Sequence, residues 1–264
     1  MNMIGNQTSN RIVKDLDLIM RLNASAEDDI QTIQEVIIQS SKDFSLEDKA
    51  DFWEINGVDC KDGIYKVDFS KQLLPSKTQD EHAEHRKSAK DEFYIPTYPE
   101  FHAIISALEK NKGNTQYQSQ VEQLRQFIKR SALEKWLMML TRIRYNPTGD
   151  DIVIHNYKQK DEYSIKSDNF TGPDGYVLKA SNAEKPLQSL LDTSENVNEI
   201  NQIYKWLTDG DAYIYRLNSR PENRDERVAG FYAGSDGADF NGWVPQDSDA
   251  SLGVRFASQT RVKK

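Results

Sequence analysis

The sequence has one cysteine and no long hydrophobic run, and each shortage excludes a class of protein. Cys60 is alone among 264 residues, so an intrachain disulfide and a zinc site built on several cysteines are both excluded. The longest apolar run, residues 136–140, is far shorter than the roughly 20 residues that span a bilayer. No hydrophobic core of signal-peptide length stands near the first residue. We therefore predict no membrane insertion, and we expect display on a cell surface or a virion to need a route other than a leader peptide.

The sequence also has fewer basic than acidic residues. The chain has 34 Lys and Arg against 42 Asp and Glu, which gives a formal net charge of -8. Proteins dedicated to nucleic acids bind phosphate through clustered Lys and Arg, so this balance predicts no nucleic-acid partner. The basic tail at residues 261–264 is too short to change that expectation. Regular apolar periods nevertheless predict a folded chain, although 29% of its residues are charged.

Recognisable catalytic and metal-binding motifs are equally scarce. The sequence has no glycine-rich phosphate loop and no serine elbow, and we expect no catalytic residues and no cofactor. His82 and His85 would lie on one side of a helix, but no third metal ligand stands at a suitable spacing. His155 follows an apolar strand pattern and is interpreted as a packed histidine rather than a base. Asp236 and residues 247–249 offer oxygen ligands for calcium without the spacing of a calcium-binding loop.

The N-terminal half has mostly helical patterns. Apolar residues recur at helical spacing over residues 11–42, and again in two segments between residues 97 and 128. A turn signal followed by alternating apolar residues at 65–69 predicts a small hairpin. Residues 76–92 have no apolar face, so we expect an exposed and mobile connection there.

The C-terminal half alternates between strand and helix patterns. Apolar and polar residues alternate over residues 141–145 and 152–154, which predicts a hairpin, while residues 131–140 suit either a helix or a strand. The elements expected after the hairpin are helices at 186–192 and 195–207 and a strand at 212–218. We therefore predict an α+β protein with two domains, a mostly helical region at 1–130 and a second domain at 131–264.

Residues 230–256 are rich in Gly, Ala, Ser, Asp and Asn, with isolated aromatic residues. Because glycine permits positive φ and Asp and Asn favour turns, we expect this run to cross the surface as loops rather than as a central strand, before the strand-like residues 251–256 return the chain to a core. Long loops are usually either functional or disordered. Rigid aromatic residues among small polar ones are typical of binding loops, which favours a binding surface here. A structural or partly disordered loop is the alternative.

The C-terminal half resembles the C-type lectin fold in its order of strands, two helices, long loops and a last strand. Its ending, SDASLGVRFA, is similar to the endings of the formylglycine-generating branch of that fold. The stretch from YRLNSRPENRDERVAGFYAG to this ending most resembles the variable proteins of diversity-generating retroelements, particularly those of archaea and their viruses. In that family a reverse transcriptase copies a template, randomises its adenines and rewrites the C-terminal part of the protein. The resemblance covers roughly residues 131–264 and implies a non-enzymatic ligand-binding protein with a hypervariable face.

The resemblance also implies which residues are displayed and which belong to the scaffold. The displayed, ligand-binding positions would be Phe231, Tyr232, Gly234, Ser235, Asp236, Gly237, Asp239, Asn241, Gly242, Trp243, Val244 and Gln246. The scaffold would comprise Arg216, Leu217, Asn218, Asp225, Glu226, Arg227 and residues 251–255. Trp243 and Gln246 cannot arise from the Asn codons that commonly vary in the family, so they vary by another route or belong to the scaffold. The ligand would be a macromolecule, a protein or a glycan, on a cell or particle surface.

A surface that accepts many side chains must be held by the backbone and by anchors beneath it. Arg227 or Arg255 paired with Asp225 or Glu226 would supply such anchors. Leu252 and Val254 are expected in the core.

Other classes of function stay open at this point. One is an enzyme, either related to the formylglycine-generating branch or acting on glycans through a carboxylate pair. The formylglycine chemistry uses cysteines, which a lone Cys60 outside the lectin-like half does not supply. Another is a calcium-dependent lectin. A deep pocket with convergent titratable groups would favour an enzyme, and a broad shallow face would favour a binding protein.

Overall fold

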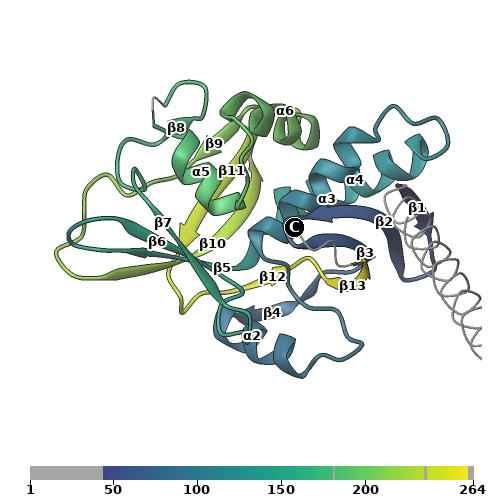
Figure 1. The fold of residues 1–264 in the computed structure, drawn as a ribbon, viewed down its shortest axis with the longest axis horizontal. Coiled ribbons are helices and arrows are strands. Elements are labelled where there is room, and N and C mark those ends of the chain that lie inside the picture. Colours follow the sequence, from purple (N-terminus) through teal and green to yellow (C-terminus); the bar gives the residue numbers. More distant parts are fainter. Residues whose placement is uncertain (1–43, 181, 235–236, 261–264) are drawn as a thin grey trace, which may run out of the picture. The chain divides into compact units, whose positions relative to one another are not determined.

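The computed structural model of the chain describes residues 44–180, 182–234 and 237–260 (Figure 1). The helical segment expected at residues 11–42 lies outside the described residues. From residue 44 onward the described chain has both helices and sheets, so the expectation of an α+β protein is confirmed.

A seven-stranded sheet is the largest element, with the order β7-β6-β5-β10-β11-β9-β8. Its strands are β5 (Leu137–Tyr145), β6 (Asp151–His155), β7 (Tyr163–Ser167), β8 (Gly175–Tyr176), β9 (Ala212–Ile214), β10 (Asp225–Gly234) and β11 (Gly237–Trp243). The pair β9 and β11 is parallel and the other neighbours are antiparallel. The predicted hairpin is confirmed as β5 and β6, and the ambiguous segment at 131–140 divides between the end of a helix and the start of β5.

The expectation that the small-residue run after residue 230 crosses the surface as loops is wrong, because β10 and β11 lie inside the sheet. Phe231 pairs with Phe240 and Ala233 pairs with Ala238, and all four side chains are buried. Small alanines alternate with aromatic residues on this inner side, which is the period of a strand. Reading Gly and Ala only as turn formers concealed that period.

A second, four-stranded sheet joins the two ends of the described chain. Its order is β1-β2-β3-β13, with β1 (Ser45–Asp48), β2 (Phe52–Cys60), β3 (Gly63–Ser70) and β13 (Val254–Thr260). A smaller pair joins β4 (Leu74–Thr78) to β12 (Ser248–Ser251). The predicted hairpin before residue 70 is confirmed as β2 and β3.

The described chain does not separate at the domain boundary predicted after residue 130. Residues from Phe44 onward belong to one compact unit, and the predicted boundary falls inside it, within the helix Gln118–Glu134. The reason is the C-terminal strand β13, whose Val254 pairs with Phe69 of β3. A strand pairing between distant segments leaves no local composition signal.

The described helices are α2 (Gln79–Ser88), α3 (Tyr98–Lys110), α4 (Gln118–Glu134), α5 (Glu184–Leu191) and α6 (Val197–Thr208). The predicted helices between 97 and 128 are confirmed as α3 and α4, and those at 186–192 and 195–207 as α5 and α6. Thr97 and Asn196 begin α3 and α6 with capping boxes, in which a side chain satisfies backbone N–H groups of the first turn.

Residues 79–88 form a helix where the sequence predicted a mobile connection. Thr78 begins it with a capping box. Gln79 is buried, and its side-chain amide donates hydrogen bonds to the backbone carbonyls of Met139 and Thr141, both at 2.9 Å. The prediction was wrong because buried polar contacts attach α2 to the sheet, and an apolar period cannot reveal such contacts.

The core lies between the inner face of the large sheet and the helices. Phe231 of β10 lies 5.2 Å from Phe101 of α3, and Phe240 of β11 lies 4.6 Å from Tyr204 of α6, both measured between ring centroids. Leu252 and Val254 are fully buried, as predicted. The helices α3 and α6 therefore cover one face of β10 and β11.

Candidate functional site

The outer face of β10 and β11 carries the side chains that point away from the core. Tyr232 pairs with Asp239, and Gly230 pairs with Asn241. Because successive side chains on a strand point to opposite faces, these residues lie opposite the buried Phe231. Tyr232, Asp239 and Asn241 are partly exposed.

Across the strands, the outer face presents a row of aromatic rings with one carboxylate in it. Tyr176 pairs with Tyr213, Tyr213 pairs with Asp239, and Asp239 pairs with Tyr232. Trp136, which precedes β5, stacks on Tyr232 with ring centroids 4.9 Å apart. At the other end Tyr176 meets Tyr213 edge to face at 5.7 Å. We call these five residues the aromatic row.

Trp243 extends the aromatic surface beside the row. Its ring meets Trp136 edge to face with centroids 4.7 Å apart. Gly230 lies below both rings, and a Cβ atom there would be 3.8 Å from Trp136 and 3.9 Å from Trp243, which is ordinary contact distance. The rings are thus held by each other and by the sheet beneath them.

Asp239 has an unusual electrostatic environment. Burial raises the pKa of its carboxyl to about 7, the nearby carboxylate of Asp174 adds to the rise, and the Asn241 side chain opposes it. Its Oδ1 atom is buried and has no hydrogen-bond partner among the described residues. An unpaired, partly desolvated carboxylate costs stability, and such groups are enriched at functional sites.

Charged anchors hold the sheet beside this face, as expected, but with partly different pairs. Arg227 Nε donates to Asp225 Oδ2 at 3.0 Å, which is one of the predicted pairings. Glu226 instead accepts from Arg144 at 2.8 Å. Arg255 donates to Asp68 at 2.7 Å, so its predicted pairing with Asp225 or Glu226 is wrong. Since β13 belongs to the other sheet, Arg255 meets the carboxylates of β3 rather than those of β10.

Arg216 is a buried part of the scaffold. Its side chain is 3% exposed, and its Nη1 donates to the backbone carbonyl of Asn169 at 3.1 Å. Its backbone N–H donates to Asp174 Oδ1 at 2.6 Å. Arg216 thereby fixes the loop that carries Asp174 against the end of β9. The neighbouring Leu217 bridges to Thr171 of the same loop.

The predicted displayed positions divide among several locations. Those on the outer face and partly exposed are Tyr232, Asp239, Asn241 and Trp243. Val244 and Gln246 are exposed after β11, and Gly234 is partly exposed at the end of β10. Ser235 and Asp236 lie outside the described residues.

Three of the predicted positions belong to the inner side or to the turn. Phe231 is wrong as a surface residue, because its ring is fully buried against α3. The prediction of Gly237 as a variable displayed position is wrong for a different reason. Its φ is +130°, and a Cβ there would lie 2.1 Å from the carbonyl oxygen of Asp211. Gly242 pairs with Ala229 on the inner side, where a Cβ would meet the Arg227 side chain at 3.0 Å.

Sequence reasoning missed Trp136, Tyr176, Tyr213 and Asp174. They come from three separate segments, and strand pairing alone brings them beside Asp239. Aromatic residues next to predicted strands were the available signal, but nothing local indicated their common face.

The histidines considered as metal ligands or bases have structural partners. His155 is fully buried, with Nδ1 3.2 Å from Thr141 Oγ1 and Nε2 3.0 Å from the carbonyl of Ser189. Burial lowers its pKa to about 4, which agrees with the interpretation as a packed histidine. Burial likewise lowers the pKa of His82 to about 4. His85 Nε2 lies 3.0 Å from the carbonyl of Phe93. Within the described ranges, no three His, Cys, Asp or Glu residues are grouped to hold a metal ion.

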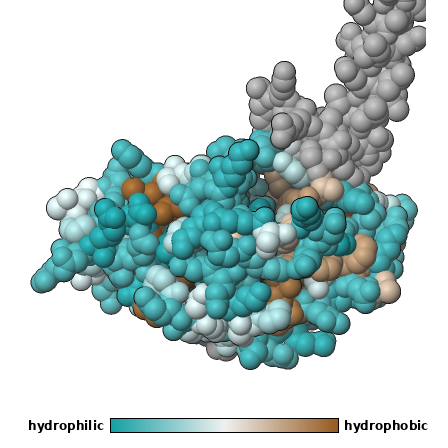
Figure 2. All heavy atoms as spheres, turned by 90° about the horizontal axis from the view of Figure 1, so that it is seen from below, coloured by the Kyte–Doolittle hydropathy of each residue, from teal (hydrophilic) through white to brown (hydrophobic). Residues whose placement is uncertain are grey.

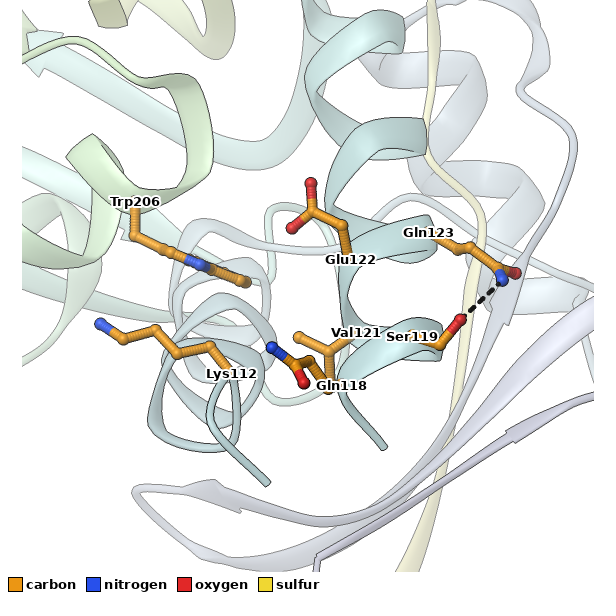
Figure 3. Close-up of a pocket in the computed structure, with 7 residues that line it drawn as sticks. All are labelled: Lys112, Gln118, Ser119, Val121, Glu122, Gln123 and Trp206. Carbon is orange, nitrogen blue, oxygen red and sulfur yellow. Dashed lines mark hydrogen bonds between the residues drawn. The ribbon is translucent and has the colours of Figure 1, made fainter. Parts of the chain in front are cut away.

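The larger hollows lie away from the aromatic row. One, of about 600 Å³, lies where α4 faces α6 (Figure 3). Its lining residues are Lys112, Gln118, Ser119, Val121, Glu122, Gln123 and Trp206. Figure 3 shows Glu122 and Trp206 on opposite walls, and the Gln123 amide donates to Ser119 at 3.3 Å. A more polar hollow of about 490 Å³ is lined by residues of β7, of α5 and of the segments beside them, including Asp150, Asp168 and Asp192. The lining of the first hollow offers one carboxylate and one ammonium, with no convergent pair of carboxylates.

Hydrophobic exposure does not by itself mark an interface. Figure 2 shows one face of the molecule as mostly hydrophilic, with separate hydrophobic areas. The most exposed large hydrophobic residues in the described ranges are Leu178, Leu133, Val244, Tyr215 and Tyr163. Singly exposed hydrophobic residues are normal on soluble domains, so the aromatic row is singled out by its arrangement rather than by its apolarity.

Comparisons with known proteins provide no relative. No protein-family model matches the chain, and no curated protein or solved structure matches it either. Among the described helices, none combines the length and apolarity needed to cross a membrane.

Proposed function

We propose that the outer face of β10 and β11 is a recognition surface for a macromolecular ligand, a protein or a glycan. One observation carries the proposal: the inner residues of these strands build the core, while four of the predicted binding positions, Tyr232, Asp239, Asn241 and Trp243, lie outward and partly exposed. Substitutions outward therefore leave the core contacts in place. The ligand-binding role is non-enzymatic and depends on the presentation of side chains.

The finer part of the proposal concerns the family. The order of elements and the C-terminal residues at 248–257 resemble the C-type lectin fold of variable proteins from diversity-generating retroelements. In that setting a fixed backbone carries positions that are rewritten from one copy to the next. A backbone held by strand pairing and by the Arg227–Asp225 pair supports such exchange, because neither depends on the outward side chains.

Two matched libraries test the recognition surface. The first randomises the outer positions Tyr232, Asp239, Asn241 and Trp243. The second randomises the inner positions Phe231, Ala233, Ala238 and Phe240. Resistance to a protease measures the folded fraction, and selection against panels of surface proteins and glycans then measures binding. We expect the outer library to remain largely folded and to yield binders, and the inner library to lose the fold. Equal damage in the two libraries would overturn the proposal.

The retroelement part has its own test in genomic DNA. We expect a near-copy of the DNA that encodes residues 216–256, differing at adenines, beside a gene for a reverse transcriptase. If the complete source genome lacks such a copy, the retroelement part of the proposal is rejected. The binding surface is then tested by the libraries alone.

A further inference from the structure

The centre of the aromatic row is a carboxylate between two tyrosines. Asp239 stands directly opposite Tyr232 on one neighbouring strand and Tyr213 on the other. Side chains directly opposite on adjacent strands have Cβ atoms about 5 Å apart, so both rings flank the carboxylate. Each tyrosine is supported from its far side, Tyr232 by stacking on Trp136 and Tyr213 by the edge of Tyr176.

The carboxylate at this centre is not neutralised from within the described part of the chain. The charged neighbour that acts on Asp239 is a second carboxylate, Asp174. The buried Arg216, whose backbone N–H contacts Asp174, directs its guanidinium at the backbone carbonyls of Asn169 and Pro173. The Oδ1 atom of Asp239 has no partner among the described residues, while the residue as a whole is partly exposed. The carboxyl groups of Asp239 and Asp174 therefore act on each other beside a partly exposed part of the outer face.

The rings of the row already accept a cation at one end. The Lys179 ammonium lies over the ring of Tyr176, 4.8 Å from its centroid. Such contacts arise because the face of an aromatic ring carries negative charge density, and they strengthen when water is excluded. The same chemistry is present at the centre of the row, with a carboxylate added.

We infer that the centre of the aromatic row, formed by Asp239 with Tyr213 and Tyr232, binds the guanidinium group of an arginine side chain on a protein ligand. The inference rests on the proposed recognition surface and names the chemistry of its ligand. A guanidinium is planar, packs against aromatic rings and presents paired N–H donors to a carboxylate. It supplies the missing positive charge and packs its plane against the flanking rings. A neutral sugar offers hydroxyl donors but leaves the charge of two carboxylates uncompensated.

Charge complementarity across the whole chain agrees with this ligand. The protein has a formal net charge of -8, so a basic protein segment is attracted over a longer range than a neutral glycan. The attraction brings the ligand close, and the row then selects the guanidinium.

The test is an NMR titration of the full chain with N-acetyl-arginine methylamide. The matched probe is N-acetyl-citrulline methylamide, which has nearly the same shape and no charge, and a panel of simple methyl glycosides represents glycans. We expect saturable shifts of the backbone amides of Tyr213, Tyr232 and Asp239 with the arginine probe. The citrulline probe should bind at least about tenfold more weakly, because it loses the charge of the contact.

Two substitutions of equal charge change make the test specific. Asp239→Asn should abolish the response to arginine, whereas Glu222→Gln, at an exposed position between β9 and β10, should leave it unchanged. The spectrum of each variant reports whether it is folded. Equal affinity for arginine and citrulline, an undiminished response in Asp239→Asn, or a preference for a glycoside would overturn the inference. If the arginine probe does not bind while the outer library still yields binders, the recognition surface is retained and the inferred arginine preference is rejected. If neither the probe nor the library gives binding, both proposals are rejected.

Discussion

On the same two strands, β10 and β11, one face is committed to the fold, while the other is buried at Val228 and partly exposed around Tyr232 and Asp239. On the inner face, Phe231 and Phe240 are fully buried and contact aromatic residues of α3 and α6. On the outer face, Tyr232 and Asp239 are partly exposed and contact residues of neighbouring strands. Because the side-chain period of a strand is two, a single residue step separates these roles. Exposure on these two strands therefore follows the strand period rather than the composition of the segment.

The largest expected effect is on the inner face. Phe240→Ala removes a ring that packs on Tyr204, Tyr98 and Phe231. We expect the free energy of unfolding to fall by about 3–5 kcal/mol, measured by urea denaturation. A loss below about 1 kcal/mol would break the distinction between the two faces.

The next largest effect is expected at the turn between the strands. Gly237 has a φ of +130°, and an added Cβ would lie 2.1 Å from a backbone oxygen of Asp211. We expect Gly237→Ala to lower the free energy of unfolding by roughly 2–4 kcal/mol, because a backbone clash adds to conformational strain. Gly230→Ala is the control, since its Cβ would meet neighbours at 3.6 Å or more. Thermal unfolding of both variants gives the comparison, and a similar loss in the two would contradict it.

A smaller effect depends on pH. The pKa of Asp239 is raised to about 7 in the folded protein from an ordinary value of 3.8, mainly by burial. The folded state therefore binds more protons than the unfolded state between these values, so the free energy of unfolding falls as the pH rises from about 4 to about 7 and stays at the lower level above that range. We expect Asp239→Asn to raise the free energy of unfolding by roughly 1–3 kcal/mol at pH 8 relative to the parent, and by much less at pH 4. Denaturation at both pH values measures this difference. A benefit at pH 4 as large as that at pH 8 would show that burial does not raise the pKa of this carboxyl.

The smallest effect is expected for an outward ring. Tyr232→Ala removes one stacking contact with Trp136 and no core contact. We expect a change of less than about 1 kcal/mol in the free energy of unfolding, together with loss of the arginine response. Calorimetry provides the first value and the NMR titration the second. A large loss of stability with retained binding would reverse the roles of the two faces.

Local patterns predicted much of the fold. The helical spacing of Phe101, Ile104 and Leu108, together with Thr97 as the cap, was enough to place α3. The alternation around Tyr65, Val67 and Phe69 was enough to place β3. These signals worked because the apolar period of an element reflects its own buried face.

Other elements had no such signal. The helix α2 is held by Gln79 and by a cap at Thr78, and its pattern is polar throughout. In β10 and β11 the inner positions alternate between Phe and Ala, so small residues concealed the strand period. The site was predicted in part: Tyr232, Asp239, Asn241 and Trp243 do share the outer face, but Phe231 does not.

The sequence alone determined the type of most elements, the absence of disulfides, the negative charge and the residues at the end of the chain that build the core. Tertiary structure alone decided that β13 completes the sheet of residues 45–70 and that Tyr176, Tyr213 and Trp136 join Asp239 in one row. The physical reason is that periodicity and capping act within a few residues, whereas strand pairing joins segments far apart in the chain. Which ring stands beside which carboxylate is fixed only when those strands come into register.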